Sequence, residues 1–180
     1  STQSQAASAG GLSQDELLDR LAEGILTKLP PDFDLEEAEA KFPVAYLESM
    51  NTVLVQELIR FNRLTAVVRT SLAQIQKAIK GLVVMSGELD AMFSAMLVNQ
   101  VPGLWSKVSY PSLKPLSSWA EELFERVDFI QIWIDTGIPK CFWITGFYFP
   151  QAFITGVMQN HARKYQLPID TVTFGYQLVH

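Results

Sequence analysis

Side chains that could do chemistry are scarce, because the 180 residues include two histidines and one cysteine. His161 falls in a predicted helix beside Arg163 and Lys164, and no second ligand is spaced to share a metal ion with it. Cys141 has no histidine near it in the sequence and is expected to be a small buried residue. One cysteine also excludes an internal disulfide and a thiolate zinc cluster within the chain.

The carboxylates that could act as general acid and base form two groups, Glu36, Glu37 and Glu39, and Glu121, Glu122 and Glu125. Both groups lie near predicted helix starts, where acidic side chains interact favourably with the helix dipole. A phosphate-binding loop needs the spacing G-x-x-x-x-G-K-[ST], and the lysine beside Gly81 lacks it. We therefore expect no catalytic residue, no cofactor and no metal site in this segment.

One long helix must position most of the other elements. Residues 44–80 contain no proline or glycine, and their apolar side chains recur at steps of three and four. A helix of this extent would be about 55 Å long, and its apolar face would need a partner. A coiled coil or a bundle could supply that partner, and we favour a spine helix inside a globular assembly.

Capping spacings predict three further helix starts, at Ser13, Asp34 and Ser118, each followed three residues later by glutamate. Another helix is expected over residues 88–99. The proline-containing residues 100–117 are expected to form a structured loop.

The sequence has a different character after Lys140. Residues 142–149 form an uncharged β-prone run, Pro150 can begin a helix, and residues 172–179 alternate apolar with polar side chains. This order predicts an α+β fold, mainly helical with one long spine helix, which ends in a strand–helix–strand unit. That unit could be a βαβ unit or a mixed arrangement. The expected divisions are a flexible lead-in (1–12), a helical subdomain (13–140) and the start of a β-containing subdomain (141–180).

Charge is unevenly distributed along the sequence. Residues 1–50 carry ten acidic and three basic side chains, whereas residues 60–80 carry five basic and no acidic ones. The basic segment is ordinarily explained as a solvated helix face; it could also pack against the acidic segment or face an acidic partner. The net charge of −5 and the pI near 5.0 argue against a general nucleic-acid-binding protein.

Residues 141–162 carry no charge over a length that could span a membrane. Pro150 and Gln151 lie in the middle of this run, and a buried strand followed by a helix accounts for the same residues, so we expect no membrane span. Core packing explains most of the aromatic cluster in residues 142–153. The remainder is expected to face another surface.

Six strings carry a family resemblance: SMNTVLVQE (49–57), IRFNRL (59–64), QKAIKGLVVMS (76–86), YPSLKPL (110–116), FWITGFYFPQ (142–151) and ARKY (162–165). In this order they resemble the C-terminal region of dynein heavy chains. The likeness covers roughly residues 13–179. It is closer to the axonemal heavy chains of cilia and flagella than to the cytoplasmic ones.

The resemblance implies a segment that follows the sixth AAA+ module of a motor ring and rests on one face of that ring. It implies a fold that is helical first and closes with a small β-barrel-like part. Because the family continues through more strands than this sequence holds, the barrel is expected to be incomplete. The implied role is non-catalytic: to steady the ring and to regulate motor output.

The resemblance also implies partners and a location. ATP, magnesium and the microtubule-binding tip would belong to other parts of the parent motor. The direct partners would be AAA+ ring modules of the same heavy chain. Other dynein subunits and microtubules would be contacted through the parent motor. No nucleic acid and no membrane would be bound. The location would be cytoplasmic and cytoskeletal, in the axoneme of a cilium or flagellum.

The candidate docking residues for the ring are three arginines of the basic segment and five aromatic residues: Arg60, Arg63, Arg69, Phe142, Trp143, Phe147, Tyr148 and Phe149. The alternative function is a stand-alone helical adaptor that uses residues 44–82 to grip another helix. A well-ordered dimer through that helix in sedimentation would favour the adaptor, whereas a soluble monomer with an exposed edge would favour the excised domain.

Overall fold

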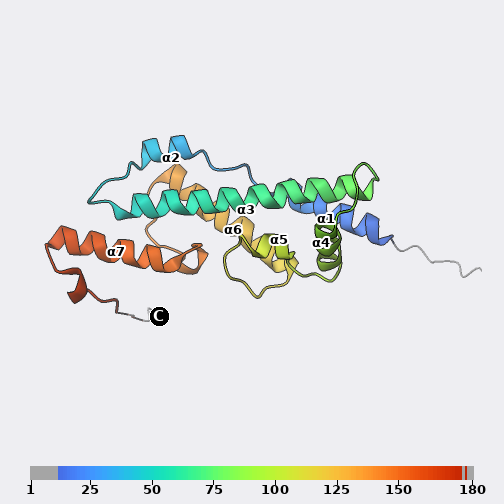
Figure 1. The fold of residues 1–180 in the computed structure, drawn as a ribbon. Coiled ribbons are helices and arrows are strands. Elements are labelled where there is room, and N and C mark those ends of the chain that lie inside the picture. The colour runs from blue at the N-terminus through green and yellow to red at the C-terminus, as the bar shows by residue number, and fades with distance from the viewer. Residues whose placement is uncertain (1–11, 176, 178–180) are drawn as a thin grey trace, which may run out of the picture.

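A long helix, α3 (Ser49–Ile79), runs through the computed structural model (Figure 1). The structure describes residues 12–175 and residue 177. α3 has 31 residues and is therefore about 46 Å long. Its apolar face, which includes Leu54 and Leu58, is fully buried under other helices. The predicted spine helix is present, although it is shorter than expected.

Contacts from outside the helix set where α3 begins. The backbone N–H of Ser49 donates to Oδ1 of Asn160 at 2.8 Å, so an orphan donor of the first turn is satisfied by a distant side chain. Nδ2 of Asn51 donates to the carbonyl oxygen of Pro43, also at 2.8 Å. Periodicity alone could not show these contacts, and the predicted start at residue 44 is therefore five residues too early.

Two helices from the acidic N-terminal segment lie along α3. α1 (Gln14–Lys28) lies beside the C-terminal half of α3, and α2 (Leu35–Lys41) lies beside the N-terminal half (Figure 1). The link between them is fixed to α3, because the side-chain amide of Asn62 exchanges hydrogen bonds of 2.8 and 2.9 Å with the backbone N–H and C=O of Phe33.

Side-chain caps begin three of the helices. Ser13 and Asp34 cap α1 and α2, as predicted, and Ser13 forms a full capping box. Ser86 caps α4 (Gly87–Leu97) by accepting from the N–H of Leu89 at 3.3 Å. In each case a side-chain oxygen satisfies a backbone donor that has no partner inside the helix.

The predicted helix start at Ser118 is wrong. The cap position before α6 (Leu116–Thr136) is Pro115, three residues before the predicted cap. Asn99, in the preceding loop, accepts from the N–H of Leu116 at 2.9 Å through its carbonyl and from the N–H of Ser117 at 3.0 Å through its side chain. A cap that comes from far away in the sequence leaves no local spacing to recognise.

Indole and phenol rings join the short helix α5 (Gly103–Ser106) and α6 to α3. The indole N–H of Trp105 donates to Oγ of Ser71 on α3 at 2.8 Å. Its ring stacks on Trp119 of α6 with centroids 5.5 Å apart, and Trp119 stacks on Tyr110 at 6.1 Å. This buried row of rings makes the loop before α6 part of the core.

α7 (Pro150–Tyr165) packs antiparallel on the N-terminal half of α3 (Figure 1). Gly156 of α7 faces α3 directly. A Cβ atom at this position would lie 3.1 Å from Cγ2 of Val53 and 3.4 Å from Sδ of Met50. The missing side chain therefore allows the two helix backbones to approach each other.

The predicted strand at residues 142–149 is wrong. These residues form a loop with one short 3₁₀ turn, η1 (Ile144–Gly146). Phe147 points into the core and is 1% exposed, whereas the hydroxyl of the next residue, Tyr148, donates to the carbonyl oxygen of Val108. β-Prone side chains here pack individually against helices and do not pair with another strand.

The predicted strand at residues 172–179 is also wrong where the structure describes it. Residues 172–175 and 177 form no strand, and the preceding turn is η2 (Ile169–Thr171). Alternating side chains do not stabilise a strand unless its backbone groups are paired. The rest of that segment lies outside the described residues, as does the predicted lead-in apart from Leu12.

The described part of the protein is therefore helical and contains no strand, sheet or barrel. The expected α+β class with a strand–helix–strand ending is wrong for this part. Cys141, expected to be buried, is exposed. The proposed division at residue 140 stays a prediction.

Candidate functional site

The three arginines proposed for docking do not share one face of α3. Successive helix residues are turned by about 100°, so Arg60 and Arg69, nine residues apart, point about 180° apart. Arg60 and Arg63, three residues apart, are neighbours on the helix surface. The structure accordingly separates Arg69 from the other two.

Arg69 is used inside the domain. Its Nη1 lies 2.9 Å from Oδ1 of Asp32, and its Nη2 donates to the carbonyl oxygen of Pro30 at 2.8 Å. Oγ1 of Thr65 donates to the same Asp32 oxygen at 3.0 Å. At this point the basic segment packs against the acidic N-terminal segment, which was one of the alternatives that the charge pattern left open.

Arg60, Arg63 and Phe149 lie at the surface, and with Ile59 we call them the outer α3 face. The guanidinium of Arg60 lies 5.6 Å from the centroid of the Phe149 ring. Phe149 is 51% exposed and Ile59 is 50% exposed. Two arginines and two exposed apolar side chains give this face the composition of a protein-binding surface.

The other four candidate aromatics pack within the domain. Phe147 stacks on Phe153 of α7 with centroids 4.5 Å apart, and Phe142 lies 4.8 Å from the same ring. Trp143 packs edge-on against a ring of α6, and Tyr148 lies edge-on to Phe61 at 5.1 Å. Their main role is to join α3, α6 and α7, and Phe149 is the member of this group most available to a partner.

Glu57 of α3 is a site residue that the sequence analysis missed. Its carboxylate accepts hydrogen bonds from the backbone N–H groups of Tyr148 and Phe149, the second at 3.1 Å, and Nη1 of Arg60 lies 3.4 Å away. The side chain is fully buried. Burial raises the pKa of Glu57 above its usual value, although these hydrogen bonds and Arg60 act in the opposite direction.

A sequence signal for Glu57 was available. Glu57 lies three residues after Leu54 and four before Phe61, and both of these are fully buried on α3. An acidic side chain at such a position must find donors, because an unpaired buried carboxylate is costly. The signal could have shown that a partner exists, but not that the partner lies more than 90 residues away.

A buried arginine holds the aromatic loop on its other side. Arg126 of α6 is 6% exposed, lies 3.8 Å over the ring of Tyr110 and donates to the carbonyl oxygen of Phe147 at 3.3 Å. Its Nη2 lies 2.6 Å from Oε1 of Glu122. Burial acts to raise the pKa of Glu122, but hydrogen bonds from Lys114 and Arg126 hold it below its usual value.

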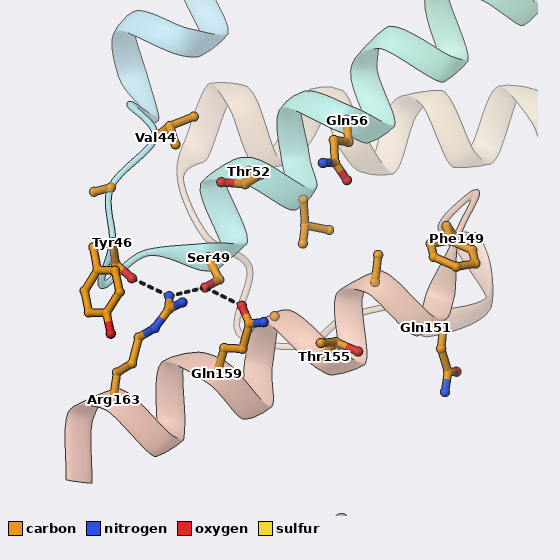
Figure 2. A pocket seen from close by; sticks show the side chains of 14 residues that line it. Val44, Tyr46, Ser49, Thr52, Gln56, Phe149, Gln151, Thr155, Gln159 and Arg163 are labelled. Atoms are coloured by element: carbon orange, nitrogen blue, oxygen red, sulfur yellow. Dashed lines mark hydrogen bonds between the residues drawn. The ribbon is translucent and has the colours of Figure 1, made fainter. Parts of the chain in front are cut away.

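A groove with a volume of about 640 Å³ opens beside the outer α3 face, between α3, α7 and the link that precedes α3 (Figure 2). Phe149 lies at one end and Arg163 at the other (Figure 2). Polar uncharged side chains line much of the length between them: Thr52, Gln56, Gln151, Thr155 and Gln159. Such a lining offers hydrogen bonds from amides and hydroxyls.

Contacts within the domain occupy the charged end of the groove. Nη1 of Arg163 lies 2.7 Å from Oγ of Ser49 and also donates to the carbonyl oxygen of Tyr46 (Figure 2). The guanidinium lies 4.2 Å from the Tyr46 ring centroid. Oγ of Ser49 in turn lies 3.1 Å from Oε1 of Gln159. Arg163 therefore fixes the start of α3 to α7.

The groove has no catalytic arrangement in the part of the protein that the structure describes, because none of its lining residues is a carboxylate or an imidazole. No group of three or more His, Cys, Asp or Glu among the described residues is placed to hold a metal ion. None of the described helices combines the length and the apolar character needed to cross a membrane.

A family model for the C-terminal domain of the dynein heavy chain matches residues 1–180. The chain belongs to this family. The resemblance carried by the six strings is thereby confirmed. The outer α3 face and the groove beside it are surfaces of a dynein C-terminal domain.

Similar proteins are axonemal dynein heavy chains. The chain is 57% identical over 168 residues to dynein axonemal heavy chain 3 of Mus musculus, covering 93% of this chain. It is 51% identical over 177 residues to dynein axonemal heavy chain 1 of Homo sapiens, covering 98% of this chain. Dynein axonemal heavy chain 12 of Mus musculus is 50% identical over 167 residues, or 93% of this chain. The chain spans 4–5% of the length of these relatives.

Proposed function

We propose that this protein is the non-catalytic, structural and regulatory C-terminal domain of an axonemal dynein heavy chain. In this proposal it packs on AAA+ ring modules of the same heavy chain, in the axoneme of a cilium or flagellum. The parent is an ATP-driven microtubule motor, and its ATP, magnesium and microtubule sites lie elsewhere in the heavy chain. Other dynein subunits are reached through the parent.

The outer α3 face is the observation that supports docking. Arg60 and Arg63 remain at the surface, and Arg60 lies over the exposed ring of Phe149. Arginine and aromatic side chains dominate the binding energy of many protein interfaces. The stand-alone adaptor is disfavoured, because the apolar face of α3 that an adaptor would use is covered by helices of the same chain.

Charge reversal in the full heavy chain tests this proposal. In the double variant Arg60→Glu and Arg63→Glu, each reversal removes up to about 1 kcal/mol of docking free energy and adds repulsion toward an acidic partner. We expect a changed ATPase rate and gliding velocity, together with faster hydrogen exchange along α3. Lys107→Glu, an exposed lysine outside this face, is the matched control. Unchanged ATPase, gliding and exchange in the double variant would contradict docking through this face.

Nucleotide binding tests the non-catalytic part of the proposal separately. The sequence lacks the glycine spacing of a phosphate-binding loop. The 180-residue protein is therefore expected to give no heat of ATP binding in calorimetry at micromolar concentrations. A micromolar dissociation constant for ATP would overturn this part.

A further inference from the structure

The loop between α3 and α4, residues 80–86, exposes four consecutive apolar side chains. Leu82 is 71% exposed and Val84 is 90% exposed, with Val83 and Met85 also at the surface. Isolated apolar side chains are common on protein surfaces, but a contiguous apolar patch marks an interaction site. We call residues 82–85 the apolar loop.

The apolar loop is held in a defined conformation. Gly81 has φ of 72°, and its N–H donates to the carbonyl oxygen of Ala78 at 2.9 Å. The N–H of Leu82 donates to the carbonyl oxygen of Lys77, also at 2.9 Å. These two bonds form a Schellman motif at the end of α3. At its other end the loop leads into Ser86, the cap of α4.

Leu82 lacks the apolar partner that a Schellman motif commonly provides. In this motif the residue after the glycine commonly packs on an apolar side chain three or four positions before the helix end. Here those positions hold Lys77 and Gln76, and Nε2 of Gln76 is turned toward Glu23 of α1 at 3.2 Å. The backbone therefore presents Leu82 outward.

The position of the loop indicates which partner covers it. Nζ of Lys80 lies 3.8 Å from Oδ1 of Asp19, so the loop is next to the first turns of α1 (Figure 1). Leu12, just before α1, and Leu17, in its first turn, are 39% and 48% exposed. The family is a C-terminal domain and the chain spans 4–5% of its relatives, so nearly all of a heavy chain of this family precedes α1.

We propose that the apolar loop docks into an apolar recess on the part of the same heavy chain that immediately precedes this domain. This inference rests on the proposed function and adds a second contact to it, because the apolar loop follows the C-terminal end of α3, whereas Arg60 lies in its N-terminal half. The occupant is covalently joined to α1 and is therefore present at high effective concentration beside the loop. Even a small apolar contact is then sufficient for docking.

Site-specific photo-cross-linking in the full heavy chain tests the inference. p-Benzoylphenylalanine is placed at Val84, at Ile59 of the outer α3 face, or at Leu113, a fully exposed control in another loop. Cross-linked peptides are then identified by mass spectrometry. From Val84 we expect peptides of the same heavy chain that lie before residue 1, and from Leu113 we expect none from that segment.

The pattern of cross-links separates the two proposals. If Ile59 cross-links to the heavy chain but Val84 reaches only a second copy, another protein or nothing, the inference is overturned and the proposed function stands. If neither Val84 nor Ile59 cross-links to the rest of the heavy chain, both are overturned. If Val84 alone does so, the inference stands and docking through the outer α3 face is overturned.

Hydrogen exchange in the full heavy chain gives a second measurement. Val84→Ser removes an exposed apolar side chain without touching the core of this domain. We expect the amides of residues 80–86 to exchange at least tenfold faster in this variant, because the loop leaves its recess. Leu113→Ser should leave them unchanged. Equal exchange in the wild type and Val84→Ser would overturn docking of the loop.

Discussion

A carboxylate in the middle of an apolar helix face holds a distant loop in place. Glu57 binds the N–H groups of Tyr148 and Phe149, and these residues lead directly into α7. The two N–H groups and the Arg60 guanidinium offset part of the cost of burying this carboxylate. It also orients Phe149 toward Arg60 and so helps to form the outer α3 face.

Glu57→Gln is expected to destabilise the 180-residue protein by about 1–3 kcal/mol. The amide keeps one acceptor oxygen but directs an N–H₂ group at backbone donors, which leaves a buried group unsatisfied. Chemical denaturation gives the free energy of unfolding. Glu125→Gln, at an exposed position of α6, is the control and should change it by less than about 0.5 kcal/mol. An equal stability of the two variants would contradict the role of Glu57.

The stability difference between the wild type and Glu57→Gln should depend on pH. The folded state raises the pKa of Glu57 above 4.5, so above that pH the folded state binds more protons than the unfolded state does. The free energy of unfolding contributed by this group is therefore greatest below about pH 4.5 and falls as pH rises through the raised pKa. The advantage of the wild type should shrink over that window, and an advantage that grows would contradict the assignment.

The sequence predicts on which side of α3 each candidate arginine lies, but not which residue that arginine contacts. Helical geometry alone places Arg60 and Arg63 together and Arg69 on the other side of α3. The contact of Arg69 with Asp32 could not be predicted, because it depends on the path of the link between α1 and α2, which no periodic pattern describes.

At the scale of elements, α3 and α7 share the most extensive contact between two helices in the described part of the domain. Gly156 allows the approach, and on α3 the nearest atoms belong to Val53 and Met50. Residues of α3 and α7 line the groove. Phe149, at the start of α7, belongs to both the groove and the outer α3 face. The packing of Gly156 against α3 therefore helps to set the shape of the groove and of the outer α3 face.

Gly156→Leu should lower the free energy of unfolding by about 1–3 kcal/mol, because the new side chain must push α7 away from Val53. Gly24→Ala on α1 is the matched control, since nothing lies within 4 Å of a Cβ atom there. The control should gain up to about 1 kcal/mol from helix propensity. Thermal unfolding followed by circular dichroism measures both. A Gly156→Leu variant as stable as the wild type would contradict the close packing.

The sequence predicted helices correctly where apolar side chains recur regularly over many residues. Its two strand predictions were wrong where the structure describes them. The spacing of apolar side chains predicted α3 and the caps predicted α1 and α2, because both signals are local. The aromatic run at residues 142–149 has strand propensity, but its shape is set by Glu57 and Arg126, which contact it from two different helices. Strand propensity depends on the packing environment, and tertiary contacts overrode it here.

On the scale of the whole molecule, α3 is the element that nearly every other helix contacts. The acidic N-terminal segment lies along it, and α4, α5, α6 and α7 complete the layer around it (Figure 1). The buried apolar side chains therefore form one cluster centred on α3. Because the helices share this core, we expect cooperative unfolding.

Thr70→Pro tests the dependence of the fold on α3, because Thr70 is exposed in the interior of α3, in its C-terminal half, and loses little packing when replaced. Proline inside a helix costs about 3 kcal/mol or more. We expect loss of helical signal well beyond one turn of α3 and a broadened thermal transition. Thr70→Ala, which keeps the helix intact, should unfold as the wild type does. A sharp, unshifted transition in the proline variant would contradict the central role of α3.

The contacts between Ser49 and α7 have a consequence during translation. Asn160, which caps α3, lies 111 residues after Ser49. At about 5–20 residues per second, a ribosome needs on the order of ten seconds to reach it. Throughout that interval the first turns of α3 lack both their cap and their covering helix. The domain therefore completes its fold only after α7 has been synthesised.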